Sequence, residues 1–354
     1  MSPCVRGPYP SSKRRAKPQS GGAGGVKRRS RITSTDVARE AGVSRTTVSY
    51  VLNGVSQRGI SESTATRVRE AAARLGYLPS AAARSLRRGH SELVLLVVGD
   101  WPYSYAVSQV IEHLTRQLAP RGLTVLVHHR TRDSPPITEL CWTVDAAAVI
   151  SLEGVSDREE ETLQAAGIHV THPRTAAATD HPGILAAASP DIGRLQVEHL
   201  AATGHRRIAY ALPDDPTLAV FASPRLGGAR AACERLGLTV PHEQQVPLNT
   251  SGAAAVVAAF RSLDDPVTAV CAYNDDVALA VLAGMAVHHL TAPTDLAVIG
   301  VDNVPTAALA SPPLTTVDFH PAAIGRHLAA IVLGEQNEPP DVLASPVLVV
   351  RESA

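Results

Sequence analysis

The chain has 354 residues, of which 45% are hydrophobic, so it can bury a sizeable core and should fold into two or three domains. Its net charge of zero hides a split: residues 1–90 carry 18 Lys and Arg against 4 Asp and Glu, and residues 91–354 carry 15 against 29, which predicts a polyanion-binding front part. No segment has the apolar length of a membrane helix or a signal peptide, and the four cysteines have no metal-ligand or disulfide spacing, so the composition predicts a cytoplasmic protein without a metal site.

Residues 1–30 form a basic tail that is rich in Pro, Gly and Ser and has no apolar periodicity, so it is predicted to be disordered. Its glycine run at 21–25 follows no strand and precedes no helix, which indicates a linker and not a phosphate-binding loop. Two roles stay open for its Lys and Arg side chains: nonspecific attraction to phosphates, or simple solubilisation of the chain.

The stretch 32–54, ITSTDVAREAGVSRTTVSYVLNG, predicts two short helices joined by a tight turn. Thr33 and Asp36 have the spacing of a capping box at the start of the first helix. Gly42 supplies the left-handed backbone that ends this helix, and Ser44 caps the second one. The pattern is typical of a helix-turn-helix.

The helical periodicity gives this pair of helices an apolar face and a polar face. The apolar positions are Val37, Ala38, Ala41, Val43, Val48, Val51 and Leu52. The outward positions are Arg45, Thr46, Thr47, Ser49 and Tyr50. A face of donors and one guanidinium suits the major groove of DNA, whereas the alternative is an ordinary helical hairpin within an all-α core.

A third helix is predicted over 60–77, with Ser61 as its cap and Gly76 as its stop. After Pro79, residues 80–89 are helix-prone but too short to stay folded in water alone. Residues 32–89 thus resemble the DNA-binding headpiece and hinge of the LacI/GalR family of bacterial transcription regulators. The motifs DVAREAGVSRTTVSYVLNG and TRVREAAARLGYLPSAAARSL carry the resemblance, with Ser80 where an asparagine is commoner in the family.

The resemblance implies a role for each matched position of the headpiece. Base-reading positions are Arg45, Thr46, Tyr50 and, in the hinge, Leu86. Phosphate-positioning residues are Thr33, Ser44, Thr47, Ser49 and Asn53. The chemistry agrees, because Arg pairs bidentately with guanine and hydroxyl groups hold phosphates. Leu86 has two compatible roles, as a wedge into the minor groove and as packing within a pair of hinge helices.

From Leu93 onward, short apolar runs alternate with helical patterns, which predicts an α/β architecture with parallel sheets. A first set of strands is expected at 93–98, 123–128, 146–150 and near His169, with helices at 104–119 and 157–166. A second set is expected at 208–212, 268–272 and 296–301, with helices at 192–202, 225–236, 252–263 and 276–288. The segment 314–318 is assigned as a possible return to the first set, followed by a helix at 322–333.

This second part also resembles the family, through QVEHLAATGHRRIAY, AYNDDVALAVL, DLAVIGVDNVP and SPPLTTVDF. The resemblance implies a two-lobed regulatory domain similar to periplasmic sugar-binding proteins, with doubly wound sheets on either side of a cleft. The expected organisation is a tail at 1–30, an all-α helix-turn-helix headpiece at 31–79, a hinge helix at 80–90 and an effector-binding and dimerisation domain at 91–354. Its lobes are expected at about 91–188 with 319–335, and 189–317 with 336–354.

Matched positions also imply an effector site in the cleft, at Arg225, Asn274, Asp275 and Asp302. Carboxylates beside a guanidinium suit polyhydroxyl or carboxylate ligands. Trp101, Tyr103 and Tyr105 follow the first strand, where the family has a ring that packs on the effector, so Tyr103 and Tyr105 are added as effector-binding candidates. The alternative is that these rings cover the edge of the sheet. Arg174 falls where the family often has an acidic sugar contact, and a basic residue there leaves open an anionic effector as the alternative.

The sequence therefore predicts a ligand-responsive repressor that binds a near-palindromic double-stranded DNA operator as a homodimer. Its effector is expected to be a sugar or a related metabolite, and no cofactor motif is present. A solute-binding protein of a transporter is the alternative, although it has no use for the first ninety residues. An enzyme is the third interpretation, and the chain offers no nucleophile with a base for one.

Overall fold

A computed structural model describes residues 32–52, 59–77, 91–171, 189–335 and 345–354. The chain divides into two compact units, residues 1–83 and 84–354. The basic tail, the hinge with Leu86, and the candidates Asn53 and Arg174 lie outside the described residues. Among the helices that the structure describes, none combines the length and the apolar character needed to cross a membrane.

The described residues of the first unit form three helices, α1 (Ser34–Ala41), α2 (Arg45–Leu52) and α3 (Glu62–Leu75). The predicted helix ends are confirmed. The Asp36 carboxylate accepts hydrogen bonds from the backbone N–H of Thr33 at 3.0 Å and from its hydroxyl at 2.7 Å. Gly42 has a φ of 63°, and the Ser44 hydroxyl accepts from the Thr47 N–H at 3.0 Å. The turn between α1 and α2 is thus fixed on one side by the left-handed backbone of Gly42 and on the other by the Ser44 cap.

Helix α3 completes this unit and ends as predicted at Gly76, whose φ is 63°. Its Ser61 cap accepts from the Thr64 N–H at 3.3 Å. The Arg67 Nε donates to the Ala41 carbonyl at 3.1 Å, which ties α3 to the end of α1. Helices this short are marginal in isolation, so their packing depends on one small core. Its buried members are Val37, Ala38, Ala41, Val48, Val68, Ala71 and Ala72.

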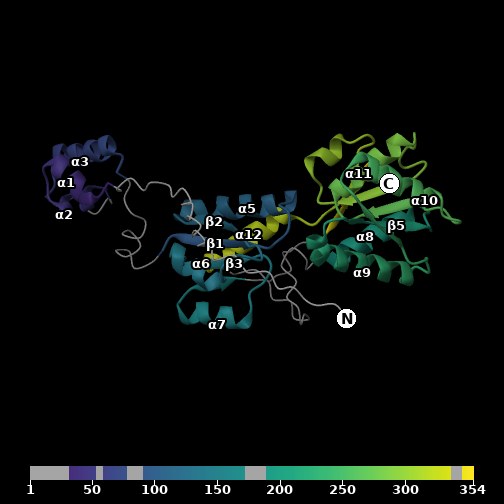
Figure 1. The fold of residues 1–354 in the computed structure, drawn as a ribbon, viewed down its shortest axis with the longest axis horizontal. Helices are drawn as coiled ribbons and strands as arrows, with labels where there is room; N and C mark the ends of the chain where they lie inside the picture. The colour runs from purple at the N-terminus through teal and green to yellow at the C-terminus, as the bar shows by residue number, and fades with distance from the viewer. Residues whose placement is uncertain (1–31, 53–58, 78–90, 172–188, 336–344) are drawn as a thin grey trace, which may run out of the picture. The chain divides into compact units, whose positions relative to one another are not determined.

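The second unit begins with a parallel sheet in the order β2-β1-β3-β4. Its strands are β1 (Leu93–Val98), β2 (Thr124–His129), β3 (Ala148–Ser151) and β4 (His169–Thr171). The helices described in this lobe are α5 (Tyr105–Leu118), α6 (Ile137–Val144), α7 (Asp157–Ala165) and α12 (Pro321–Val332). Helices α5 and α12 pack against each other beside this sheet (Figure 1). The apolar run of β1 is buried along nearly its whole length, as expected for a central parallel strand.

A second sheet has the order β10-β9-β8-β7-β5-β6, and only β10 runs antiparallel to its neighbour. Its strands are β5 (Ile208–Pro213), β6 (His242–Val246), β7 (Ala269–Ala272), β8 (Ala297–Val301), β9 (Thr315–Asp318) and β10 (Val347–Val349). Its helices are α8 (Ser189–Ala202), α9 (Ala219–Arg235), α10 (Thr250–Arg261) and α11 (Asp275–Val287). Helices α8 and α9 pair on one face, and α10 and α11 pair on the other (Figure 1). The predicted two-lobed α/β fold is confirmed.

The structure decides one open strand assignment and corrects one helix boundary. Strand β9 pairs with β8 in the second sheet, so the chain crosses to the first lobe only after Asp318, where α12 follows. Helix α9 begins at Ala219 and not at Arg225, and it contains Pro224. Helix α6 and strands β6 and β10 were not expected from the sequence. Strand β6, HEQQV, is a mostly polar edge strand, which explains why hydrophobic patterning missed it.

Glycines allow α8 and α9 to approach closely, and this contact positions a residue of the site. A Cβ at Gly193 of α8 would overlap the carbonyl oxygen of Arg225 on α9. A Cβ at Gly228 of α9 would likewise overlap the carbonyl oxygen of Pro190. The backbone that carries Arg225 is therefore held against α8 at a distance that only glycine permits.

Candidate functional site

Helix α2 presents its predicted reading face to solvent. Arg45 and Thr46 are exposed, and Tyr50 is 47% exposed, whereas Val48 on the opposite side is 1% exposed. Thr47 and Ser49 lie at the border of this face and are half-buried. The alternative of a helical hairpin inside a larger core requires these side chains to be covered. Their exposure favours a surface that meets an external partner.

This face carries a cationic group, Arg45, at the start of α2. Arg39, Arg69 and Arg74 each pair with a carboxylate of the same unit. None of the ion pairs seen among the described residues involves Arg45. The Ser44 hydroxyl lies 2.9 Å from that of Thr47, and the exposed Thr33 caps α1, so these predicted phosphate contacts sit at the helix starts. Helix N-termini favour anions, and phosphate groups suit this arrangement.

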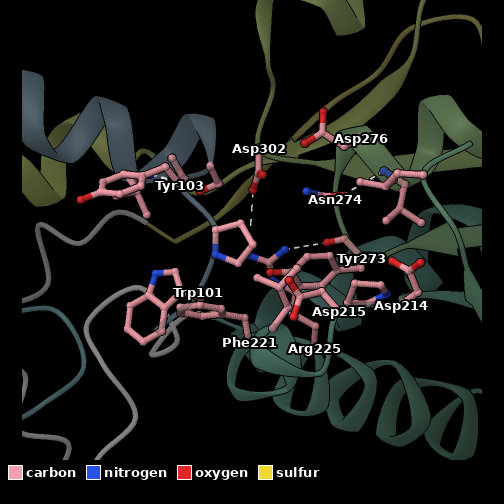
Figure 2. Close-up of a pocket in the computed structure, with 18 of the residues that line it drawn as sticks. Trp101, Tyr103, Asp214, Asp215, Phe221, Arg225, Tyr273, Asn274, Asp276 and Asp302 are labelled. Atoms are coloured by element: carbon pink, nitrogen blue, oxygen red, sulfur yellow. Dashed lines mark hydrogen bonds and ion pairs between the residues drawn. The ribbon is translucent and has the colours of Figure 1, made fainter. Parts of the chain in front are cut away.

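The second unit contains a pocket of about 240 Å³ that both lobes line (Figure 2). Several of its polar groups follow strands directly, where the carboxyl ends of parallel strands leave a crevice. Asp214 and Asp215 follow β5, Asn274 follows β7, and Asp302 follows β8. Its apolar wall is made of Pro102, Ala106, Val107, Pro213, Leu218, Phe221, Leu248, Val277 and Phe319, together with the rings of Trp101, Tyr103 and Tyr273.

Among the described residues that line this pocket, Arg225 is the one basic group, and its side chain is 4% exposed. Its Nη1 donates to the Tyr273 carbonyl at 2.6 Å, and its Nη2 lies 3.9 Å from Asp302 Oδ1. The guanidinium also stacks on two rings, 4.8 Å from the centroid of Tyr273 and 5.7 Å from that of Phe319. These contacts fix the position of the guanidinium in the wall of the pocket. Figure 2 shows Arg225 beside Tyr273.

Asp302 lies opposite this guanidinium on a backbone with a φ of 105°, an unusual conformation for a residue other than glycine. Burial raises the pKa of its carboxyl to about 7, and the charge of Arg225 counteracts part of that rise. The neighbouring carboxylates of Asp275, Asp276 and Asp318 raise the pKa further. Strained backbone and a perturbed carboxyl together are typical of a functional position.

Two adjacent aspartates at the start of α11 point in different directions. Asp275 is fully buried, and its carboxylate accepts hydrogen bonds from the Val304 N–H at 2.9 Å and the Thr316 hydroxyl at 2.6 Å. It is therefore placed in the core under the loop of Asp302, whereas the exposed Asp276 lines the pocket. The Asn274 side-chain carbonyl caps α11 by accepting from the Val277 N–H at 3.0 Å, which leaves its amide NH₂ to face a ligand.

The three aromatic candidates after β1 are placed differently. Trp101 is buried in the pocket wall and packs edge-on against Phe221, with the ring centroids 5.1 Å apart. Tyr103 also lines the pocket and is half exposed. Tyr105 is the first residue of α5 and lines a neighbouring cavity with His320 instead. Of the six predicted effector contacts, the structure thus brings four into one pocket: Tyr103, Arg225, Asn274 and Asp302.

Sequence reasoning did not single out Asp214, Asp215 and Asp276, all of which line the pocket. A signal for the first two was available, because they follow the predicted strand at 208–212 directly and so fall at the edge where ligands bind. Asp276 was not distinguishable from Asp275 by pattern. Within the described part of the chain, no three His, Cys, Asp or Glu side chains gather as metal ligands would.

Two family models match the chain. The model described as bacterial regulatory proteins, lacI family, matches residues 33–80. The model described as periplasmic binding protein-like domain matches residues 197–354. The first match contains α1, α2 and α3, and the second contains most of the lobe that carries Arg225, Asn274 and Asp302.

Curated relatives extend the similarity over most of the chain. The HTH-type transcriptional repressor PurR of Vibrio cholerae serotype O1 (strain M66-2) is 31% identical over 314 residues, which cover 85% of this chain and 90% of the relative. The ribose operon repressor of Escherichia coli (strain K12) is 29% identical and covers 91% of this chain and 99% of the relative. Both relatives are named as repressors.

Solved structures of the same fold include two bound complexes. The lac repressor dimer bound to operator and the anti-inducer ONPF is 24% identical, covers 91% of this chain and 99% of that one, and gives a TM-score of 0.68. The complex of the transcriptional regulator CelR with cellobiose is 26% identical, covers 92% of this chain and all of that one, and gives a TM-score of 0.59. The arrangement of a headpiece before a two-lobed domain is thus shared.

Proposed function

The chain belongs to the LacI family of bacterial regulatory proteins, a family of ligand-responsive DNA-binding repressors, and we propose that its operator affinity is set by a small molecule bound in the pocket around Arg225. One observation carries this proposal: a single chain combines an exposed, donor-rich face on α2 with a buried charged pocket in a second unit. A reading surface and a sensing pocket on separate units are what a ligand-responsive regulator requires.

Within the headpiece, we propose that Arg45, Thr46 and Tyr50 read base edges in the major groove. Their exposure on one face of α2 supports this role. The phosphate contacts are proposed at Thr33, Ser44, Thr47, Ser49 and Asn53, and Leu86 in the hinge is proposed as the minor-groove wedge. Contacts of this kind fix the register of the protein on the duplex, while the base contacts select the sequence.

We propose that the protein binds a near-palindromic operator as a homodimer, because one headpiece contacts too few bases to select a site. Two short hinge segments can stabilise each other only when they are brought together on DNA. An effector that favours one angle between the lobes would change the spacing of the two hinges and so their folding. A coupling of about 1–3 kcal/mol is enough to change operator affinity from severalfold to a hundredfold.

The effector is proposed to be a sugar or a related metabolite held by Tyr103, Arg225, Asn274 and Asp302. A guanidinium, a carboxylate and an amide around aromatic rings suit a hydroxylated ring. The names of a ribose operon repressor and of a CelR–cellobiose complex among the similar proteins support this class. Asp275 is proposed to position the loop of Asp302, and Tyr105 is left outside the contact set.

A regulator that reads the chromosome acts in the cytoplasm, which is the location we infer.

The proposed function is tested by selecting DNA from a random-sequence pool with the full chain, followed by gel shifts of the enriched site at two salt concentrations. Specific binding should weaken steeply with salt, because each phosphate contact releases counterions. A solute-binding protein of a transporter enriches no sequence, and that result would overturn the proposal. Thermal-shift screening with sugars and small acids then tests the pocket separately.

A further inference from the structure

The loop that carries Asp302 has an unusual backbone over two successive residues. Asp302 has a φ of 105° and Asn303 a φ of 50°, so both lie in a region that residues with a Cβ rarely adopt. Such backbone persists only where its surroundings hold it. Here the Asp302 N–H donates to the Val317 carbonyl at 2.9 Å, and the Val304 N–H donates to the Asp275 carboxylate. The conformation that presents Asp302 to the pocket is therefore imposed by neighbouring elements.

Asn303 uses both ends of its side-chain amide to join two other segments. Its Oδ1 accepts a hydrogen bond from Arg351 Nη2 at 2.7 Å, and its Nδ2 donates to Asp318 Oδ2 at 3.3 Å. A guanidinium can only donate and a carboxylate can only accept, so one orientation of the amide satisfies both partners. The Asn303 backbone N–H donates to the Thr316 hydroxyl at 3.3 Å. The side chain therefore cannot turn without losing one of its two partners.

One of the two segments leads out of the second lobe. Asp318 is the last residue of β9, and residues 318–320, the crossing, then lead to α12 in the first lobe. The second oxygen of Asp318 accepts from the His320 N–H at 2.7 Å, and His320 Nδ1 lies 3.5 Å from the same oxygen. His320 has a φ of 57°, so the crossing also contains a left-handed residue that its contacts hold in place. Asp318 thus binds Asn303 with one oxygen and the start of α12 with the other.

The other segment is an anchor within the second lobe. Arg351 Nη1 donates to the Leu314 carbonyl at 2.6 Å, and the Arg351 N–H donates to the Thr315 hydroxyl at 3.0 Å. Ser353 is fully buried, and its hydroxyl accepts from the Thr315 N–H at 2.8 Å. Arg351 therefore ties one side of Asn303 to the sheet, while the other side of Asn303 is bound to the crossing.

Asp302 and Asn303 are adjacent in the chain but face different parts of the unit. Asp302 lines the pocket around Arg225 (Figure 2). Asn303 lines the neighbouring cavity together with Asp318 and His320, and Asp302 borders both spaces. Because the peptide bond that joins the two residues is planar, a turn of the Asp302 backbone also turns Asn303. The Asn303 amide is thus placed between the pocket and the crossing.

Resting on the proposed function, we infer that Asn303 is a positioning residue that transmits a change at Asp302 to the crossing between the lobes. A ligand that draws the Asp302 carboxylate into a new position turns the peptide shared with Asn303. Since Arg351 is anchored, the adjustment falls on the bond to Asp318 and so on the start of α12. This route lets a ligand alter the angle between the lobes, which the proposed regulation requires.

The inference is tested by hydrogen exchange of the full chain without DNA or ligand, read by mass spectrometry with fragmentation. The Val304 amide reports on the loop and the His320 amide on the crossing. The Ser262 amide, which donates to the Ala258 carbonyl at 3.0 Å at the end of α10, exchanges by local fraying and reports on the rest of the lobe.

Asn303→Gly removes the side-chain amide but suits the left-handed backbone. Exchange at Val304 and His320 should rise about three- to tenfold, as the loss of one hydrogen bond gives, while exchange at Ser262 stays within about twofold. An increase at Val304 without one at His320, or an equal increase at Ser262, would overturn the inference. Unchanged exchange at all three amides would overturn it as well.

Transmission itself is tested by a change on the pocket side. Asp302→Asn alters the group that would meet a ligand, and it should change exchange at His320 by about threefold or more in a chain that keeps Asn303. In the double variant Asp302→Asn with Asn303→Gly, exchange at His320 should match that of Asn303→Gly alone within about twofold. A purely structural role of Asn303 leaves the two effects additive, and additive effects would refute the route.

A lysine variant tests the anchor. Arg351→Lys keeps the charge but loses the planar fork that reaches both the Leu314 carbonyl and Asn303, so exchange at His320 should rise about two- to threefold. Arg230→Lys is the matched control, because Arg230 pairs with Glu243 on the surface, and it should leave exchange at His320 unchanged. Equal responses in the two lysine variants would contradict the role of Arg351.

Failure of this inference and failure of the proposed function are distinguishable, because the exchange is measured without DNA or ligand. Additive effects at His320 would refute the route through Asn303 and leave sequence-selective DNA binding intact. Loss of sequence-selective DNA binding would refute the regulator and leave the coupling between the loop and the crossing as measured.

Discussion

The headpiece and the regulatory unit place their functional side chains in opposite environments. In the headpiece, Arg45 and Tyr50 are exposed on a helix whose other face packs on a small core of valines and alanines. In the regulatory unit, Arg225 and Asp302 are buried in the wall of a pocket. With the roles proposed above, substitutions on the exposed face of α2 should alter DNA reading without changing stability, whereas substitutions at Arg225 and Asp302 should alter ligand binding and stability together.

The magnitudes support this contrast. Substitutions of exposed side chains usually change the free energy of unfolding by no more than about 0.5 kcal/mol. Removing one partner of a buried charge pair costs about 3–5 kcal/mol, because the other charge is left without compensation. The expected change in the free energy of unfolding is therefore largest for the buried pair of Arg225 and Asp302 and smallest for the exposed Arg45.

The largest effect is expected for Arg225→Met, which leaves the Asp302 carboxyl buried without its cation. At pH 8, where Asp302 of the wild-type chain is mostly ionised, the free energy of unfolding of the regulatory unit should fall by up to about 3–5 kcal/mol, because the carboxyl of the variant must stay charged without a cation or take up a proton. Chemical denaturation of the full chain measures this change. The double variant Arg225→Met with Asp302→Asn should recover a large part of the loss. If the double variant is as unstable as the single one, the pair is not the source of the effect.

The second effect is a pH dependence that Asp302 imposes on stability. Its folded-state pKa is about 7, against an ordinary value of 3.8, so the fold favours the protonated form. The contribution of Asp302 to stability is therefore complete below about pH 4 and is lost as the pH rises to about 7, by at most about 1.4 kcal/mol per pH unit. The charged groups that face it are Arg225, Asp275, Asp276 and Asp318.

Asp302→Asn should flatten this decline between pH 4 and 7. A smaller slope should remain, because burial also raises the pKa of Asp275, to about 6. Asp133→Asn, at an exposed carboxyl, serves as the control and should retain the full slope. An unchanged slope in Asp302→Asn would show that other groups carry the pH dependence.

The third prediction compares alanine substitutions at two glycines, Gly193 in α8 and Gly227 in α9, which should change stability in opposite directions. Gly193→Ala should destabilise the regulatory unit by about 1–3 kcal/mol, because the new Cβ overlaps the Arg225 carbonyl and the helices must move apart. Ligand affinity should fall with it, since the backbone of Arg225 shifts. Gly227→Ala meets no atom within 4 Å and should stabilise α9 by about 0.5–1 kcal/mol. Thermal unfolding that moves both variants in the same direction would contradict the close approach of α8 and α9.

The smallest stability effect is expected for Arg45→Ala in the headpiece. Because Arg45 is exposed and joins no ion pair among the described residues, unfolding should change by no more than about 0.5 kcal/mol. Arg69→Ala, an exposed arginine on α3, is the matched control. Circular dichroism during denaturation measures both. A large destabilisation by Arg45→Ala alone would place Arg45 in the packing of the headpiece and remove the contrast between the two units.

The helix ends of the headpiece were predictable because their causes are local. The Thr33–Asp36 pair, Gly42 and Ser61 act within a few residues of themselves, so spacing alone located them. The sequence left strand β9 open between the two sheets, because pairing with β8 is a long-range contact that no local pattern specifies. Helix α9 extends back through Pro224, which sequence patterns take for a helix boundary.

The residues of the pocket could likewise be predicted only in part from the sequence. Arg225, Asn274 and Asp302 were located from the family resemblance and from strand ends, and the structure brings them into one pocket. Successive residues of a helix point about 100° apart around its axis. On α11, the Asp275 carboxylate therefore accepts a hydrogen bond from the Thr316 hydroxyl in the core, whereas Asp276 lines the pocket. The sequence alone does not show how α11 is rotated against the sheet, so it could not predict which of the two carboxyl groups faces the pocket.

The most direct test of the account is the base preference of the wild-type chain and of Arg45→Ala, measured by selection from random duplex DNA. The wild-type chain should enrich a near-palindromic site, and Arg45→Ala should lose about 1–3 kcal/mol of discrimination at one position in each half-site while it folds normally. Arg69→Ala should keep the wild-type preference. An Arg45→Ala protein that enriches the same site with undiminished preference at every position would contradict the assignment of the exposed face of α2 as the DNA-reading surface.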